Sequence, residues 1–213
     1  PMQLTVTPSL PSALVGGGNN PQPGEISLAH NGVLFIDEMP ELARSGLEVL
    51  RQPLEDRKIT ISRAKYNVEY PCSFMLVASM NPCPCGYYGD PTHHCACTPG
   101  QIQRYMNKIS GPLLDRIDIH CEIQAVPFAE LSKMQPGESS AKIRERVISA
   151  RNIQTERFSS LPIGESGGRG RIHCNAQMTE RMLHEFAEPD AASMDMLRMA
   201  MERLKLSARA YSR

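Results

Sequence analysis

Two apolar runs in the first half of the chain predict buried strands. Residues 33–36 form an uninterrupted apolar stretch that ends at Asp37 and Glu38, and residues 74–78 form a second one. Continuous runs of this length are typical of strands that are covered on both faces of a parallel sheet. A third strand, with more alternation, is predicted over residues 117–123.

Period-two and helical spacings predict the other elements. Two short alternating runs within residues 57–70 flank a basic turn and predict a β-hairpin. Leucines at helical spacing predict a helix over residues 41–54. Further helices are predicted near residues 99–107, from residue 139 onward, and near residues 176–187 and 190–205.

The change from mixed to helical patterns predicts two domains, residues 1–130 of α/β type and residues 131–213 all-α. Lys plus Arg and Asp plus Glu number 23 each, so a nucleic-acid contact would need a local basic patch. No apolar stretch approaches the roughly 20 residues that span a bilayer, and no signal-peptide pattern opens the chain. We therefore expect a cytoplasmic location and no membrane partner.

Two acids at the end of a buried strand predict nucleotide chemistry, because open α/β sheets bind ligands at that edge. In a nucleoside triphosphatase, Asp37 would help to hold Mg²⁺, and Glu38 would orient and deprotonate the attacking water. The alternative is an acidic helix cap, since Asp37, Glu38 and Glu41 precede the predicted helix.

Two further polar residues favour the ATPase hypothesis. Asn81 follows the second apolar strand, and its amide can bond both a γ-phosphate and the attacking water. The alternative is that Asn81 and Pro82 only make a turn. Arg116 precedes the third predicted strand and could reach a neighbouring subunit as an arginine finger. The alternative is that Arg116 only forms a surface ion pair with Asp115.

Three ordered motifs together resemble the magnesium-chelatase-like AAA+ ATPases of the ComM/YifB type. They are GEISLAHNGVLFIDE at residues 24–38, ASMNP at residues 78–82 and SGPLLDRID at residues 110–118. The resemblance implies a partial AAA+ P-loop-type parallel sheet core in residues 1–130 and a C-terminal all-α lid in residues 131–213.

The resemblance also implies a role for each site residue. Asp37 and Glu38 correspond to the Walker B acids, Asn81 to sensor 1 and Arg116 to the arginine finger. Arg209, at the start of the sensor 2 helix, would reach the nucleotide of its own subunit. ATP and Mg²⁺ are the implied cofactors. The implied assembly is a homo-oligomeric ring, a hexamer, that acts on DNA by branch migration during DNA uptake and recombination.

One motif of that family is missing from this sequence. A P-loop needs Gly-x-x-x-x-Gly-Lys-Ser/Thr to hold phosphates, and no Gly-Lys-Ser or Gly-Lys-Thr occurs here. The chain is thus similar to a fragment that begins after the P-loop, and we expect negligible ATP hydrolysis by this polypeptide alone. Two alternatives stay open: a chelatase motor that inserts magnesium into a porphyrin, and a non-hydrolysing, zinc-bearing interaction module.

Four of the seven cysteines form two Cys-x-Cys pairs in one loop: Cys83, Cys85, Cys95 and Cys97. Four thiolates suit a tetrahedral Zn²⁺, and His93 or His94 could substitute for one of them. The alternatives are a redox-sensitive cluster and unligated thiols. The other three are expected to be small core residues: Cys72, Cys121 and Cys174.

The predicted hairpin carries four basic residues: Arg57, Lys58, Arg63 and Lys65. In a ring, such residues could follow the phosphate backbone of DNA through the central pore. The alternative is that they only protect an exposed hairpin edge from aggregation.

Overall fold

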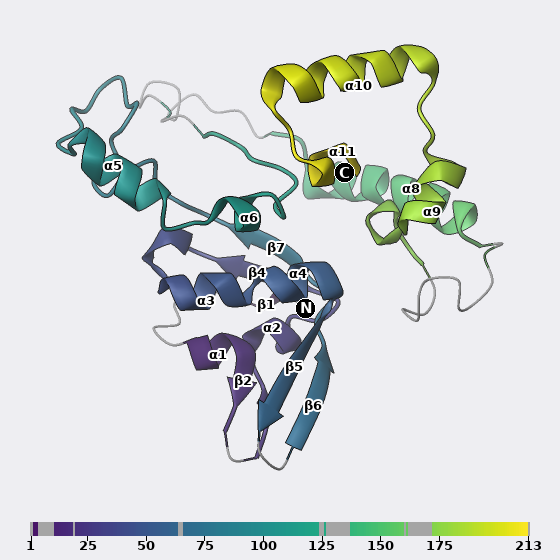
Figure 1. Cartoon of the computed structure of the whole chain (residues 1–213), viewed down its shortest axis with the longest axis horizontal. Helices are drawn as coiled ribbons and strands as arrows, with labels where there is room; N and C mark the ends of the chain where they lie inside the picture. Colours follow the sequence, from purple (N-terminus) through teal and green to yellow (C-terminus); the bar gives the residue numbers. More distant parts are fainter. Residues whose placement is uncertain are drawn as a thin grey trace. The chain divides into compact units, whose positions relative to one another are not determined.

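The computed structural model describes residues 2–3, 11–18, 20–63, 66–123, 126, 137–159, 161 and 172–212. The chain divides into two compact units, Pro1–Ala125 and Val126–Arg213 (Figure 1). The predicted boundary at residue 130 lies outside the described residues.

A three-stranded parallel sheet lies at the centre of the first unit. Strand β4 (Val33–Ile36) lies between β1 (Met2–Gln3) and β7 (Met75–Ala78). The register sets Ile36 beside Ala78. Two of the predicted strands are therefore confirmed, and their carboxyl ends meet at one edge of the sheet.

Strand β7 is less buried than its apolar sequence predicts. Leu34 and Ile36 of β4 are fully buried, whereas Met75 and Val77 of β7 are 59% and 40% exposed. Among the described strands β7 pairs only with β4, so one side of β7 has no neighbouring strand.

The predicted strand over residues 117–123 is wrong. This segment has no regular structure, and Ile119 and Ile123 are 78% and 90% exposed. A strand forms only when its backbone groups find a partner, and none of the described strands pairs with this segment.

Short helices supply most of the core around the sheet. Leu14, Ile26, Leu47, Leu50 and Leu113 are buried in one cluster with the β4 side chains. The helices of this unit are α1 (Pro11–Val15), α2 (Glu25–Leu28), η1 (Met39–Glu41), α3 (Arg44–Val49), α4 (Arg51–Asp56), α5 (Pro99–Met106) and α6 (Gly111–Leu114).

The single helix predicted over residues 41–54 is in fact interrupted. Helices α3 and α4 are separated at Leu50, which keeps a helical backbone conformation. Pro53 has no N–H to bond the carbonyl of Val49, so the helical hydrogen bonding is broken at this point.

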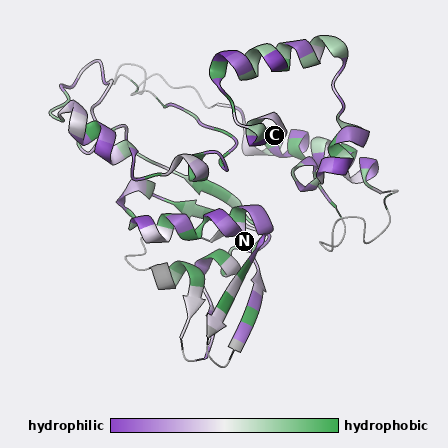
Figure 2. Ribbon diagram, viewed as in Figure 1, coloured by the Kyte–Doolittle hydropathy of each residue, from purple (hydrophilic) through white to green (hydrophobic). Residues whose placement is uncertain are grey.

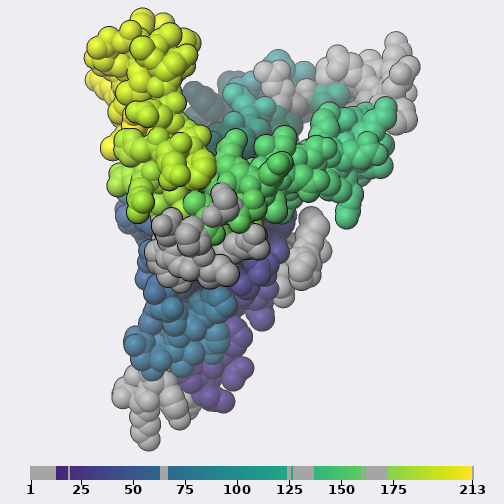
Figure 3. All heavy atoms as spheres, turned by 90° about the vertical axis from the view of Figure 1, so that its right-hand side faces the viewer, coloured from purple at the N-terminus to yellow at the C-terminus, as the bar shows by residue number. Residues whose placement is uncertain are grey.

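The predicted hairpin is confirmed as β5 (Lys58–Arg63) and β6 (Tyr66–Pro71), which pair antiparallel. Ile59 and Ile61 are both buried, as period-two alternation requires. Strands β2 (Gly16–Gly17) and β3 (Gln22–Pro23) form a second hairpin. The hairpins lie side by side in Figures 1 and 3, and the Tyr70 hydroxyl donates to the Pro21 carbonyl at 2.9 Å.

The second unit is helical, as predicted. Its small core contains Phe158, Ile172 and Met182, and the ring of Phe186 meets Phe158 edge to face at 5.7 Å. Its elements are α8 (Ser140–Arg157), η2 (Asn175–Gln177), α9 (Glu180–Phe186), α10 (Ala191–Leu204) and α11 (Ala208–Ser212).

The long helices of this unit carry apolar side chains outside that core. Ile143 and Val147 on α8 and Met196 and Met199 on α10 are each more than two-fifths exposed. Both helices mix apolar and polar positions along their length (Figure 2). None of the helices in the described residues combines the length and apolar character needed to cross a membrane.

Candidate functional site

The ends of β4 and β7 are joined by hydrogen bonds at the acidic pair. The backbone N–H of Ser79 donates to the Ile36 carbonyl at 2.9 Å, and the N–H of Met39 donates to the Ser79 carbonyl at 2.9 Å. The Ser79 hydroxyl donates to Oδ1 of Asp37. Parallel register therefore places Asp37 and Ser79 opposite each other at the carboxyl edge of the sheet.

Glu38 has a backbone conformation that non-glycine residues seldom adopt. Its φ of 48° and ψ of 47° lie in the left-handed region. Its N–H donates to the Ser79 hydroxyl and to Oδ1 of Asp37, each at 3.1 Å. Its exposed side chain makes no capping bond to η1, so a helix cap does not explain this residue. Such strained positions persist where the surroundings hold them, and they gather at functional sites.

Asn81 lies just beyond β7 and is exposed. Tyr105 of α5, which is 4% exposed, packs beside it. Burial raises the pKa of the Tyr105 phenol, a hydrogen bond with the Asn81 backbone lowers it, and the charges of Glu41 and Glu38 raise it further. Asp37, Glu38 and Asn81 thus follow the ends of two adjacent strands of one sheet, and Tyr105 lies beside Asn81.

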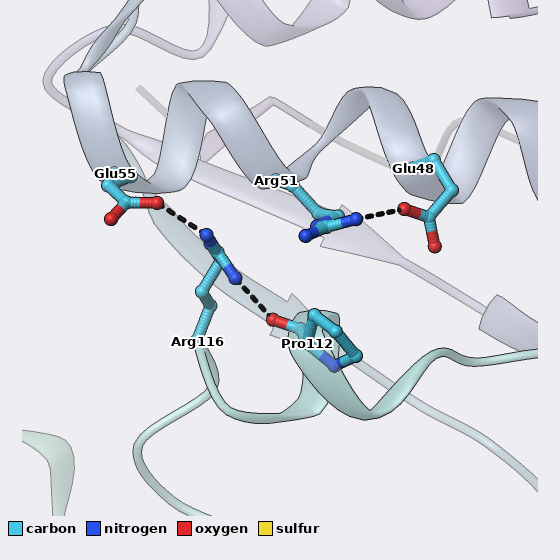
Figure 4. A network of polar contacts seen from close by, with 5 residues as sticks. All are labelled: Glu48, Arg51, Glu55, Pro112 and Arg116. Atoms are coloured by element: carbon cyan, nitrogen blue, oxygen red, sulfur yellow. Dashed lines mark hydrogen bonds and ion pairs between the residues drawn. The ribbon is translucent and has the colours of Figure 1, made fainter. Parts of the chain in front are cut away.

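Arg116 is held within its own chain. Its guanidinium forms an ion pair with Glu55 of α4 and donates to the Pro112 carbonyl (Figure 4). The Arg116 side chain is only 9% exposed, too little for the surface pair with Asp115 that the sequence left open. Because the predicted strand after it does not form, Arg116 is positioned by the end of α6.

Arg209, the fifth residue predicted to contact a nucleotide, belongs to α11 in the second unit and is half-buried.

The four loop cysteines do come together. The sulfur of Cys83 lies 3.3 Å from that of Cys85 and 3.7 Å from that of Cys95, and the sulfurs of Cys85 and Cys95 are 3.6 Å apart. With Cys97 included, all four sulfurs lie within 4.8 Å of one another. Sequence spacing predicted the pairs, and the fold of the loop brings the pairs together.

The surroundings of the loop shift the pKa values of its thiols in opposite directions. A hydrogen bond from the Tyr87 backbone and one from Cys83 lower the pKa of Cys85 to about 6. Burial raises the pKa of Cys97 to about 12. Outside this loop, Cys72 is buried as predicted, whereas Cys121 is exposed and Cys174 half-buried, so the prediction of core positions is wrong for these two.

The described basic residues of the hairpin lie toward opposite ends of β5. Lys58 begins β5 and pairs with Glu69 at 2.8 Å, and Arg57 precedes it. Arg63 ends β5, five residues further on, which corresponds to about 17 Å along a strand. The side chain of Arg63 and all of Lys65 lie outside the described residues.

Comparison with known proteins identifies the family of this chain. The family model "Magnesium chelatase, subunit ChlI" matches residues 5–131, and "Magnesium chelatase, subunit ChlI C-terminal" matches residues 137–213. The chain belongs to the ChlI family. This membership agrees with the resemblance found in the three sequence motifs.

Several ChlI-family relatives are similar over nearly the whole chain. YifB of Escherichia coli, an uncharacterized protein, is 43% identical over 203 residues, which is 95% of this chain. The competence protein ComM of Haemophilus influenzae is 44% identical over 202 residues, or 94% of this chain. The magnesium-chelatase subunit ChlI of Porphyra purpurea is 27% identical over 125 residues, 59% of this chain and 29% of its own length. The chain spans 37% of the length of the first two.

The sequence alone did not identify two residues of this site, Ser79 and Tyr105. Ser79 has the signal of a polar residue directly after a buried strand, but its role depends on the register with Asp37. Tyr105 is one aromatic residue on a predicted helix, and its sequence context does not indicate which strand end it faces.

Proposed function

We propose that this chain is the distal part of an AAA+ nucleotide-binding core followed by a helical lid, and that the whole protein is an ATP-driven motor. The observation that carries the proposal is the hydrogen bonding between Asp37 and Ser79, which sets the acidic pair next to the strand that leads to Asn81. Ligands of open α/β sheets bind at this edge.

The acidic pair fits a magnesium site. Carboxylate oxygens are the ligands that Mg²⁺ prefers. Both hydrogen bonds to the Asp37 carboxylate fall on Oδ1, so Oδ2 can serve the ion directly or through water. When bound, Mg²⁺ would neutralise charge that develops on the phosphate oxygens. Asp37 would hold the ion, and Ser79 would fix the orientation of its carboxylate.

Glu38 and Asn81 would act on the attacking water. The left-handed backbone of Glu38, whose N–H donates to the Ser79 hydroxyl and to Oδ1 of Asp37, sets the direction of its side chain. A carboxylate in this place can accept a proton from the water. The Asn81 amide can donate to the γ-phosphate while it accepts from the same water. In this proposal Glu38, after β4, would accept the proton, and Asn81, after β7, would position the water and the phosphate.

The 213-residue sequence contains no P-loop motif that would hold the phosphates. A P-loop contributes several charge-assisted bonds of about 1.5 to 3 kcal/mol each. Without the Gly-Lys-Ser/Thr element, nucleotide affinity should be too low for turnover. We therefore expect that the 213-residue polypeptide alone hydrolyses ATP negligibly.

Arg116 would complete the site of a neighbouring subunit in a ring, and Arg209 would contact the nucleotide of its own subunit. A guanidinium that reaches a transferring phosphoryl group can contribute about a thousandfold or more to the rate. Such a role in trans requires an assembly, and the assembly that we propose is a homo-oligomeric ring, a hexamer. It also requires that Arg116 change its bond with Glu55.

DNA is the partner that we propose for this motor. Identity of 44% to a protein named for competence favours a role with DNA over the porphyrin chemistry of a chelatase subunit that is 27% identical. The distal residues Arg63 and Lys65 would contact the phosphate backbone, because Lys58 is already paired with Glu69.

The hydrolysis proposal is tested in the full-length protein with Glu38→Gln. We expect DNA-stimulated ATP turnover to fall by at least about a hundredfold, while ATP binding is retained. Glu41→Gln is the matched control, since Glu41 pairs with Lys108 at 3.3 Å on the surface. Unchanged turnover in Glu38→Gln, or no nucleotide binding by the wild type, would favour the non-hydrolysing module.

The DNA proposal is tested with the double variant Arg63→Glu, Lys65→Glu. DNA binding should weaken and its salt dependence should become shallower, while basal ATP turnover stays unchanged. The control reverses Lys58 and Glu69 together, which preserves their ion pair. Full DNA affinity in the first variant would contradict the proposal, and magnesium insertion into a porphyrin by the wild type would establish the alternative.

A further inference from the structure

We propose that Cys83, Cys85, Cys95 and Cys97 bind one Zn²⁺ as a structural tetrathiolate site that folds the loop between β7 and α5. The proposal concerns this loop alone and does not depend on the ATPase function.

The sulfur positions match tetrahedral zinc. Zinc–sulfur bonds of about 2.3 Å place the four sulfurs of a tetrahedral site about 3.8 Å apart. Three of the sulfur–sulfur distances are 3.3, 3.6 and 3.7 Å, and all four sulfurs lie within 4.8 Å. A disulfide needs about 2.05 Å, so the cluster does not have the geometry of oxidised pairs. All seven cysteines are free thiols.

The loop backbone is shaped around these sulfurs. The N–H of Gly86 donates to the Cys83 carbonyl at 3.0 Å and closes a tight turn through the first pair. Gly86 has a φ of 84°, which a side chain would disfavour. The backbone N–H groups of Tyr87 and Ala96 bond the Cys85 sulfur. Backbone donors of this kind stabilise the negative charge on metal-bound thiolates.

The loop has no regular structure and little burial that could fix its conformation. Residues 81–98 contain no helix or strand, and Cys83 is their only buried residue. Segments of this length without regular structure are uncommon in compact domains. The local contacts away from the cysteines are few and lie within residues 87–93: they include a stacked pair of rings, Tyr87 and His93, the bonds that Asp90 accepts from Thr92 and His93, and the bond from the Asp90 N–H to the Tyr87 carbonyl. A bound metal would supply the folding energy that burial does not.

The donor set assigns the ion a structural role. Four thiolates fill a tetrahedral zinc site and leave no open position for water or substrate. Binding displaces the protons that remain on the thiols, and four thiolates with Zn²⁺ form a centre with a net charge of −2. Cys83 lies two residues after Asn81, so the metal would also fix the chain that follows β7.

The first test measures metal in the full-length protein, purified without chelators under reducing conditions. We expect about one zinc per chain in the wild type and less than about 0.2 in Cys85→Ala, chosen because Cys85 is only half-buried. Cys121→Ser is the matched control, since Cys121 is an exposed cysteine outside the cluster, and it should keep its zinc.

A second test needs no substitution and remains valid if Cys85→Ala fails to fold. Wild-type protein stripped of metal and loaded with Co²⁺ should show the intense visible bands of tetrahedral cobalt with thiolate ligands, and Zn²⁺ should displace them. Substoichiometric zinc in the wild type together with weak, octahedral-type cobalt bands would overturn the proposal. Full zinc content in Cys85→Ala would also overturn it, because the metal would then lie elsewhere.

Discussion

Arg116 and Glu55 form an ion pair across 61 residues of sequence, with the guanidinium almost completely enclosed. The pair joins the segment after α6 to the last turn of α4. Glu55 is the second-last residue of α4 and lies three residues before Lys58, where β5 begins. Figure 4 shows that the same guanidinium also reaches the Pro112 carbonyl. A residue proposed to serve a neighbouring subunit is thus positioned by contacts within its own.

Loss of Glu55 should destabilise the first unit. Glu55→Ala leaves an almost buried guanidinium without this carboxylate, which should lower the free energy of unfolding by about 1 to 3 kcal/mol. Glu41→Ala is the matched control, because Glu41 and Lys108 are 55% and 43% exposed and such pairs contribute less than about 1 kcal/mol. Urea unfolding of both variants measures the difference. Equal losses would mean that the Arg116–Glu55 pair stabilises the protein no more than the control pair does.

Mixed assemblies can establish whether Arg116 acts across subunits. Full-length Arg116→Ala and Glu38→Gln should each be inactive. A ring that contains both would include sites in which an intact Glu38 of one subunit meets an intact Arg116 of the next. ATP turnover should therefore reappear when differently tagged variants are assembled together and purified through both tags. Doubly tagged rings without turnover would exclude the action in trans.

Ser79 should matter for the metal rather than for folding. Removing a group that orients a metal-binding carboxylate typically costs about 10- to 100-fold in metal affinity or activity. Ser79→Ala in the full-length protein should raise the Mg²⁺ concentration needed for half-maximal turnover by this factor. Ser73→Ala is a suitable control, because Ser73 lies before the other end of β7 and its observed bonds come from its backbone. An unchanged Mg²⁺ requirement in Ser79→Ala would contradict the assigned role.

The cap of α5 should contribute measurably to stability. Thr98 and Gln101 form a reciprocal capping box, with the Thr98 N–H donating to Oε1 of Gln101 at 2.7 Å. Thr98→Ala should lower the free energy of unfolding by about 1 kcal/mol. Thr179 also precedes a helix but makes no side-chain capping bond, so Thr179→Ala should cost clearly less. A larger loss in Thr179→Ala would refute this distinction.

The buried thiol of Cys72 should be almost unreactive. Burial, followed by the charge of Asp56, raises its pKa to about 12. At pH 8 only about one molecule in ten thousand would then carry the thiolate, which is the reactive form. Mass spectrometry after brief alkylation of the native protein should find Cys121 modified and Cys72 intact. Modification of Cys72 at a similar rate would show that its surroundings open readily.

Local sequence patterns predicted most of the elements correctly. Continuous apolar runs identified β4 and β7, alternation identified the hairpin, and helical spacing identified α5, α8, α9 and α10. These features depend on neighbours within a few residues, so a single sequence reveals them. The same reasoning failed for residues 117–123, because a strand exists only if another strand pairs with it.

By itself the sequence determined which side chains end each apolar strand and which loop carries paired cysteines. Only the tertiary structure decided that β4 and β7 are neighbours, that Ser79 bonds Asp37, that Glu38 adopts a left-handed backbone and that Arg116 pairs with Glu55. The physical reason is range. Periodicity and turn chemistry act within a few residues, whereas these contacts join positions about 40 to 60 residues apart, and only chain packing sets their register.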